Sequence, residues 1–196
     1  IAGVLLRVDS PGGAVAPSQE MYSAVKRLAA VKPVVVSMGT AGASGGYYIA
    51  VAGKVVFANP STLTGSIGVR MQLANVEGLM GRIGVRSESF ASGALKNAGS
   101  PFHTMSEQER AYLEGLIHDM QEEFVRVVAE NRNLPLETVH SLADGRAFTG
   151  RQALEAGLID ALGDSEDALA RLSELTGIPV SETSLVEAPA SSRPLW

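Results

Sequence analysis

The chain has 196 residues, of which 45% are hydrophobic and 19% are charged. This composition supports one folded domain with a sizeable core and argues against general disorder. The formal net charge is −5, from 16 basic and 21 acidic residues, and does not favour a nucleic-acid-binding face. The sequence contains no cysteine, which excludes disulfides, zinc–thiolate sites, iron–sulfur clusters and cysteine nucleophiles.

No stretch of the sequence approaches the ~18 uninterrupted apolar residues that a membrane span needs. Residues 1–6 have neither a basic leader nor a cleavage site, so they do not resemble a signal peptide. The chain opens without Met in an apolar, strand-like run. We therefore expect it to be the interior piece of a longer protein.

The first half of the sequence alternates between strand and helix patterns. These patterns predict, in chain order, a strand buried on both faces over Ile1–Val8, a helix over roughly 18–30, a strand over 34–36, a loop over 39–43, a helix through Ala52 and a strand over Lys54–Ala58. This rhythm favours a parallel sheet with right-handed crossovers.

The second half is more helical, and capping-box pairs mark two of its helix starts. The predicted helices are a long amphipathic one that begins after Ser106 and its partner Glu109, a shorter one from Pro135, one from Thr149 and its partner Gln152 to Gly157, and a last one over about Asp164–Thr176. Beyond Ser181 the sequence is rich in Ser, Ala and Pro. We expect a single domain over 1–180 and a loose tail over 181–196.

The strongest local motif is Gly42-Ala43-Ser44-Gly45-Gly46, between a predicted strand and a predicted helix. Glycines around a serine permit a tight turn and leave the hydroxyl unobstructed. The first N–H groups of the helix would then point at the place where an oxyanion forms. The alternative is a serine that only caps the helix. The motif by itself leaves both interpretations open.

A second glycine motif, Ser10-Pro11-Gly12-Gly13, also follows a predicted strand. The carboxyl ends of parallel strands meet at one edge of a sheet, so both glycine loops should share that rim. The backbone N–H groups of Gly13 and Gly45 could then converge as an oxyanion hole. The alternative is an ordinary Pro-Gly-Gly turn. Neither loop matches the pattern of a P-loop.

A nucleophilic serine needs a base, and the sequence offers three histidines and one candidate lysine. His118 and His140 fall in predicted helices, whereas His103 lies in a predicted loop. Lys96 has small or apolar neighbours, with no acid in residues 91–104 to keep it charged. Burial that lowered its pKa from ~10.4 to ~7–8 would let Lys96 accept the serine proton. The alternative is a solvated loop lysine.

Four segments together resemble the signal peptide peptidase A family of serine proteases. They are Arg7–Gly13 (RVDSPGG), Ala43–Tyr48 (ASGGYY), Ala58–Gly68 (ANPSTLTGSIG) and Ser92–Lys96 (SGALK). The segments Asp144–Ala153 and Gly157–Asp160 are similar to the C-terminal part of the family. The match runs in order from about residue 3 to residue 175, which makes it far more specific than any single glycine motif.

The resemblance implies an α/β fold of the Clp-protease/crotonase type, with a parallel sheet of ββα-type units, flanking helices and a helical C-terminal part. It implies a Ser/Lys dyad with Ser44 as nucleophile and Lys96 as base, and no cofactor or metal. By analogy, Gly13 and Gly45 supply the oxyanion N–H groups. Ser44 and Lys96 lie on one copy, 52 positions apart. The chain thus resembles the short, single-copy type of the family and should need no second repeat.

Members of the family are membrane-anchored, form dome-like rings and cut signal peptides, preferring apolar or small residues in extended segments. The resemblance therefore implies peptide substrates, a homo-oligomeric ring and no nucleic-acid partner. It places the catalytic domain on the extracytoplasmic side of a bacterial cell membrane, anchored through a segment that is not in this chain. The family's N-terminal anchor and leading strands are missing from this sequence.

Three other functions fit parts of the sequence. The Gly-x-Ser-x-Gly pattern around Ser44 also matches the nucleophile elbow of an α/β-hydrolase-type esterase, for which Asp119 and His140 follow in the required order. A crotonase-like acyl-CoA enzyme would use the glycine-loop N–H groups but not Ser44 together with Lys96. An inactive assembly domain would use the long helix after Ser106 as an oligomer face, with Lys96 charged and dispensable.

Overall fold

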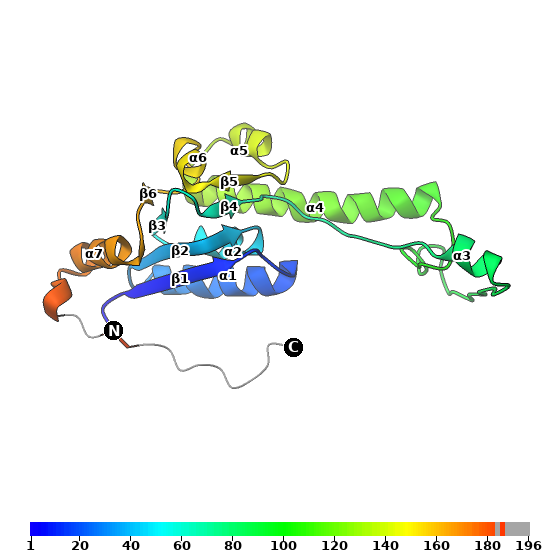
Figure 1. Cartoon of the computed structure of the whole chain (residues 1–196), viewed down its shortest axis with the longest axis horizontal. Helices are drawn as coiled ribbons and strands as arrows, with labels where there is room; N and C mark the ends of the chain where they lie inside the picture. The colour runs from blue at the N-terminus through cyan, green and yellow to red at the C-terminus, as the bar shows by residue number, and fades with distance from the viewer. Residues whose placement is uncertain (183–184, 187–196) are drawn as a thin grey trace.

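The computed structural model describes residues 1–182 and 185–186, which form a six-stranded sheet flanked by helices (Figure 1). The strands are β1 (Val4–Ser10), β2 (Val34–Ala43), β3 (Val55–Ala58), β4 (Leu63–Gly65), β5 (Ala147–Thr149) and β6 (Ala161–Leu162). The helices are α1 (Val15–Ala29), α2 (Gly45–Ala50), α3 (Glu77–Arg82), α4 (Glu107–Arg132), α5 (Leu136–Leu142), α6 (Gly150–Glu155), α7 (Ser165–Thr176) and the 3-10 turn η1 (Val180–Glu182). Most of the tail predicted over 181–196 lies outside the described residues.

Strand β2 is the centre of the sheet, because three other strands pair with it. β1 runs parallel to one edge of β2, while β3 and β4 follow each other along the other edge, at residues 35–37 and 41–43. β6 extends the sheet in parallel beyond β3, and β5 pairs antiparallel with β4. The predicted parallel sheet is confirmed for its main part, and β5 makes the whole sheet mixed.

Strand β2 is longer than predicted, because it continues through the expected loop over 39–43. Two threonine hydroxyls stabilise this part: Thr62 donates to the carbonyl of Gly39 and Thr64 to that of Gly42, each at 2.7 Å. The three-residue strand β4 pairs with the same stretch. The loop prediction was wrong because small residues here serve close packing inside the sheet.

Strand β1 begins at Val4 rather than at the first residue, and it extends to Ser10. The sequence predicts burial on both faces, but only Val8 is buried. Within the described residues β1 pairs with β2 alone, so no strand covers its other edge. Helix α1 also begins earlier than predicted, at Val15.

Side chains of the sheet alternate between two cores, as the strand period of two requires. Val36, Met38 and Val56 belong to the larger core, which includes Tyr47 of α2 and Phe124 of α4. Burying each such side chain stabilises the fold by roughly 1.5–3 kcal/mol. This core holds α2, and therefore the turn before it, firmly against the sheet.

Helix α7 covers the opposite face of the sheet. Val35 and Phe57 point to that face, where they pack with Ala168 and Leu172 of α7. Helices therefore cover both faces of β2, which explains why residues 34–36 form a continuous apolar run.

The segment just after α6 connects β3 to α4 through Asp160. One carboxylate oxygen of Asp160 accepts the backbone N–H of Val56 at 2.7 Å. Both carboxylate oxygens accept bonds from the Arg132 guanidinium at 2.9 Å, while Arg132 Nε donates to the carbonyl of Gly157 at 2.9 Å. This motif of the resemblance thus has a structural role far from the glycine loops.

The predicted helix boundaries of the second half are confirmed where a cap defines them. Ser106 and Glu109 form the predicted capping box of α4, and Thr149 and Gln152 form that of α6. Helix α7 ends at Gly177, which adopts the left-handed conformation with φ 71°. None of the helices within the described residues is long and apolar enough to cross a bilayer.

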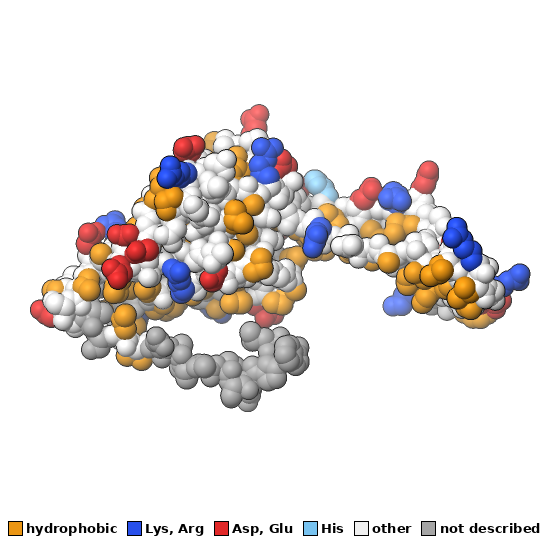
Figure 2. Space-filling model, in the orientation of Figure 1, with side chains coloured by type: hydrophobic (Ala, Val, Ile, Leu, Met, Phe, Trp, Pro, Cys, Tyr) orange, Lys and Arg blue, Asp and Glu red, His pale blue; other side chains and the backbone are white. Residues whose placement is uncertain are grey.

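The first half of α4 projects beyond the sheet and forms an arm with the extended chain after β4 and with α3 (Figure 1). We define the arm as residues 70–117. The sequence predicts one apolar stripe along all of α4, but only the part around Phe124 and Val127 is buried. Apolar side chains also lie exposed near the far end of the arm (Figure 2), among them Leu79, Ile83 and Phe90.

The turn before β5 supplies a pH-dependent contact. The guanidinium of Arg146 donates to the Asp144 carboxylate at 2.8 Å and lowers the pKa of Asp144 to about 2. A depressed carboxyl pKa stabilises the fold above its unfolded value of ~3.9 and loses that contribution as the pH falls to about 2.

We therefore expect Asp144→Asn to lower the free energy of unfolding slightly at pH 6, since the pair is exposed. The difference between the two proteins should vanish on acidification from about pH 4 to about pH 2. Urea unfolding at a series of pH values measures this difference. An equal difference at pH 6 and near pH 2 would contradict the assignment to charge.

Candidate active site

Ser44 lies at the sharp turn where β2 ends and α2 begins. Its φ is 51° and its ψ is −122°, a strained conformation that costs a non-glycine residue roughly 1–3 kcal/mol. The Ser44 N–H donates to the carbonyl of Gly65 at 2.8 Å, and its carbonyl accepts the N–H of Tyr48 at 2.9 Å. Its side chain makes no capping hydrogen bond to α2 and is partly exposed. The capping explanation of this serine was therefore wrong.

The loop after β1 packs directly against the Ser44 turn. Gly12 has a φ of +109°, and a Cβ built there would lie 2.7 Å from Ser44 Cβ and 2.9 Å from the backbone nitrogen of Gly45. Only glycine tolerates both this φ and this approach. The prediction that the two glycine loops share one rim of the sheet is confirmed.

Two unused backbone donors lie in these loops. A Cβ built on Gly45 would be 3.2 Å from the Gly13 nitrogen, so the two residues are close neighbours. Among the described residues, no hydrogen bond is donated by either N–H. The buried hydroxyl of Ser18 touches Gly45 and donates to the carbonyl of Ala14 at 2.9 Å, which positions the start of α1 beside the pair. Preorganised N–H groups of this kind can stabilise an oxyanion.

A third segment completes the rim, and reasoning from the residues assigned it no role. Gly65 and Ser66 both have a positive φ, of 69° and 50°. The Ser66 N–H donates to the carbonyl of Arg146 at 3.0 Å, and its hydroxyl donates to that of Gly145 at 3.2 Å. The available signal was the Thr-Gly-Ser-Ile-Gly run within the resemblance. The segment lies next to Ser44, because Gly65 accepts the Ser44 N–H.

Lys96 lies in the turns between α3 and α4, at the far end of the arm (Figure 1). Its side chain is exposed, and its neighbours contact other parts of the arm. Asn97 donates to the Ser89 hydroxyl at 2.8 Å, and Gly99 lies against Leu73. Within one chain, the structure therefore does not bring Lys96 to Ser44.

A comparison with protein families finds a match over most of this fold. The family model described as "Peptidase family S49" matches residues 26–179, which include Ser44 and Lys96. The chain belongs to peptidase family S49. The α/β fold, with its mostly parallel sheet and flanking helices, agrees with this membership and with the predicted Clp-protease-like class.

Known proteins support the same family. The chain is 43% identical over 182 residues to "Putative protease slr0021" of Synechocystis sp. and 42% identical over 173 residues to "Putative signal peptide peptidase SppA" of Enterococcus faecium. It is 38% identical over 176 residues to "Protease 4" of Salmonella typhi. These matches cover 93%, 86% and 89% of this chain, but only 66%, 49% and 28% of the relatives. The resemblance to signal peptide peptidase A is thus confirmed, and this S49 chain spans only part of its relatives' length.

The three histidines of the S49 chain all face carboxylates of α4. The pairs are His103–Glu109 at 3.0 Å, His118–Glu122 at 3.9 Å and His140–Glu122 at 3.4 Å. None of these contacts involves the Ser44 turn. Asp119 and His140 belong to α4 and α5, as predicted, and the described structure gives no support to a Ser-His-Asp arrangement.

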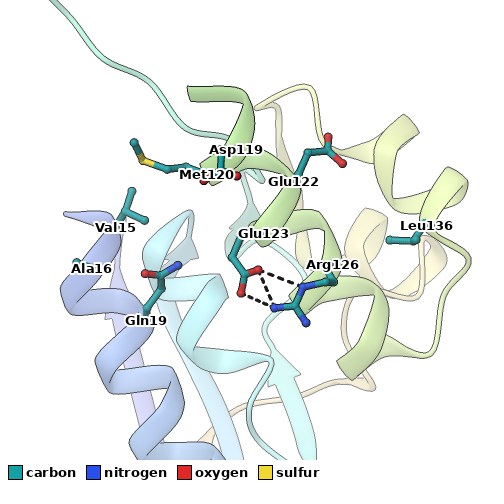
Figure 3. Close-up of a pocket in the computed structure, with 9 residues that line it drawn as sticks. All are labelled: Val15, Ala16, Gln19, Asp119, Met120, Glu122, Glu123, Arg126 and Leu136. Atoms are coloured by element: carbon teal, nitrogen blue, oxygen red, sulfur yellow. Dashed lines mark hydrogen bonds and ion pairs between the residues drawn. The ribbon is translucent and has the colours of Figure 1, made fainter. Parts of the chain in front are cut away.

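A cavity of about 590 Å³ lies between the start of α1, α4 and α5 (Figure 3). Its lining residues are Val15, Ala16, Gln19, Asp119, Met120, Glu122, Glu123, Arg126 and Leu136. Arg126 pairs with Glu123 at 2.6 Å and with Glu130 at 2.7 Å, and these carboxylates raise the pKa of its guanidinium. The cavity begins two residues after Gly13, so it is acidic and close to the oxyanion loop.

A second cavity, of about 390 Å³, runs along the arm between the extended chain after β4 and α4. Its apolar lining includes Met71, Leu73, Leu113 and Ile117. Nε2 of Gln121 donates to a backbone carbonyl at 2.9 Å, whereas its buried Oε1 has no partner in the structure. Among the described residues, no group of three or more His, Asp or Glu side chains is placed to hold a metal ion.

Proposed function

We propose that this S49 chain is the catalytic part of a serine endopeptidase that degrades cleaved signal peptides and other apolar, extended peptides at the membrane. The observation that carries the proposal is the strained, uncapped Ser44 with two unused N–H groups beside it. Strained residues cluster at active sites, and here the surrounding packing enforces the strain. Proteases named among the relatives support the same reaction.

The proposed reaction is acyl transfer through Ser44. A neutral Lys96 amine accepts the hydroxyl proton while Ser44 Oγ attacks the peptide carbonyl. The N–H groups of Gly13 and Gly45 stabilise the oxyanion, and Lys96 then donates its proton to the leaving amine. Water attacks the resulting ester with Lys96 again as base, which releases the acid and restores the serine.

Lys96 must reach Ser44 for this reaction, and one chain does not bring the two together. We propose that Lys96 comes from the arm of a second copy in a homo-oligomeric ring. The arm is long, has exposed apolar side chains and carries its lysine near the far end, all of which suit an intermolecular contact. Burial between copies would also lower the pKa of the amine, as a base requires.

The substrate and location follow from the same family. One relative is named a signal peptide peptidase, and signal peptides are apolar. An extended apolar peptide could pair with backbone near Ser44 and place side chains along the apolar cavity of the arm. We propose an extracytoplasmic site at a bacterial membrane, attached through a segment outside this chain.

Labelling with an apolar peptidyl phosphonate tests the proposal, because it requires an activated serine. We expect covalent labelling of the full-length protein at Ser44, shown by peptide mass spectrometry, and none in Ser44→Ala. Cleavage of a fluorogenic apolar peptide should rise with pH through a single ionisation and should survive His140→Ala. Labelling at another serine, loss of cleavage in His140→Ala, or no labelling of the assembled full-length protein would overturn the proposal.

A further inference from the structure

Glu109 is a buried charge that the proposed reaction does not use. It lies in the first turn of α4, at the base of the loop that carries Lys96, and only 6% of its surface is exposed. Charged residues are rarely this buried unless they are paired. We name His103, Ser106 and Glu109 the clasp.

The clasp contains more contacts than a helix cap needs. A capping box requires one bond from the Glu109 side chain to the backbone N–H of Ser106, and that bond is present at 2.8 Å. In addition, the carboxylate accepts the Ser106 hydroxyl at 2.9 Å, and its oxygens lie 3.0 and 3.2 Å from His103 Nε2. The extra partners attach the loop before the helix to its first turn.

The charge of Glu109 is maintained by these partners. Hydrogen bonds from the backbone and hydroxyl of Ser106, and then the contact with His103, lower the pKa of Glu109. Glu109 is therefore a carboxylate near neutral pH and accepts from each donor of the clasp.

The clasp also holds the entry to the loop. Asn75 donates to the carbonyl of His103 at 3.0 Å, and the N–H of Val76 donates to the carbonyl of Pro101 at 2.8 Å. The Thr104 hydroxyl donates to a carboxylate oxygen of Glu77 at 2.6 Å. The strand that enters the loop and the strand that leaves it are thus fastened together at one neck.

We infer that the clasp of His103, Ser106 and Glu109 positions Lys96 for proton transfer. The inference rests on the proposed function of Lys96, which lies five residues before Pro101 in the loop closed by this neck. A base must approach the serine hydroxyl to within about 2.6–3.2 Å, and a misplacement of about 1 Å can cost ~10²-fold in rate. His103 and Glu109 act through the loop, so they are positioning residues rather than catalytic ones.

Three variants of the full-length, assembled protein test this role. Glu109→Gln keeps the capping box, because glutamine also serves at that position, but it removes the charge that faces His103. His103→Ala removes the partner, and His103→Arg replaces it with another cation. Glu107→Gln is the matched control, since it neutralises an exposed carboxylate in the same helical turn.

We expect Glu109→Gln and His103→Ala to lower kcat about 10-fold to 100-fold, with KM changed less than about twofold. His103→Arg should restore most of kcat, and Glu107→Gln should match the wild type. In a Lys96→Ala background, Glu109→Gln should cause no further loss, because both changes remove the same function. Trypsin should cut the loop at Arg86 and Lys96 faster in His103→Ala than in the control.

The outcomes separate this inference from the proposed function. Full activity of Lys96→Ala would overturn the proposed function itself. If Lys96→Ala is inactive while Glu109→Gln and His103→Ala keep wild-type kcat, the positioning role is wrong. If a clasp variant fails to assemble, trypsin cleavage decides, and a loop as resistant as that of the Glu107→Gln protein overturns the inference.

Discussion

An equimolar mixture of the Ser44→Ala and Lys96→Ala proteins, co-assembled from unfolded chains, should recover about a quarter of wild-type peptide cleavage. Each variant alone should lose activity at least ~10³-fold, because neither nucleophile nor base can be replaced by the other. If one copy supplies Ser44 and another supplies Lys96, random mixing creates one intact site in about four.

The matched control is a mixture of Ser44→Ala with the Ser44→Ala, Lys96→Ala double variant, which has no intact serine and should stay inactive. Native mass spectrometry confirms that the mixed ring has formed. A mixed ring without activity, beside two inactive single variants, would place both residues of each site on the same chain. The arm would then have to fold back onto its own sheet.

Gly12→Ala should have the second largest effect. Its Cβ would lie 2.7 Å from Ser44 Cβ and 2.9 Å from the Gly45 nitrogen, at a φ of +109°. The loop must move, which displaces the nucleophile and one proposed oxyanion donor together. We expect kcat to fall ~10²-fold to 10³-fold, as for loss of an oxyanion donor, and stability to fall by roughly 1–3 kcal/mol.

Gly13→Ala is the matched control for this prediction. A Cβ at Gly13 meets no atom within 4 Å, its φ is not positive, and its N–H is retained. We expect stability close to that of the wild type, measured by urea unfolding, and kcat within about threefold, measured with the fluorogenic peptide. Equal damage from Gly12→Ala and Gly13→Ala would show that the close approach to Ser44 is not the cause.

The sequence predicts well those features that depend on residues close together in the chain. The capping boxes of Ser106 with Glu109 and of Thr149 with Gln152 are local hydrogen-bond patterns, and both helices begin where these pairs indicate. The same holds for Gly177, where the end of α7 needs a left-handed residue. The serine turn is similarly local, because the flanking glycines show where a strand meets a helix.

Short strands were harder to predict, since two or three residues carry no visible periodicity. β4 and β6 exist because β2 and β3 present free edges, and β5 because β4 does, so their positions depend on partners far away in the sequence. The continuation of β2 through residues 39–43 has the same origin. Its carbonyls accept hydroxyls from Thr62 and Thr64, some twenty positions further on.

The candidate site divides in the same way. The residues themselves pointed to Ser44 and to the glycine N–H groups, because a rim shared by parallel strands is a property of the fold class. The distance of Lys96 from Ser44 was not predictable, since it depends on where α4 leaves the sheet and on how far the arm extends. The sequence alone thus determined the local chemistry: the nucleophile turn, the helix caps and the alternating strand pattern. Only the tertiary structure decided which of these groups meet, because contacts between distant segments arise from packing and not from neighbouring residues.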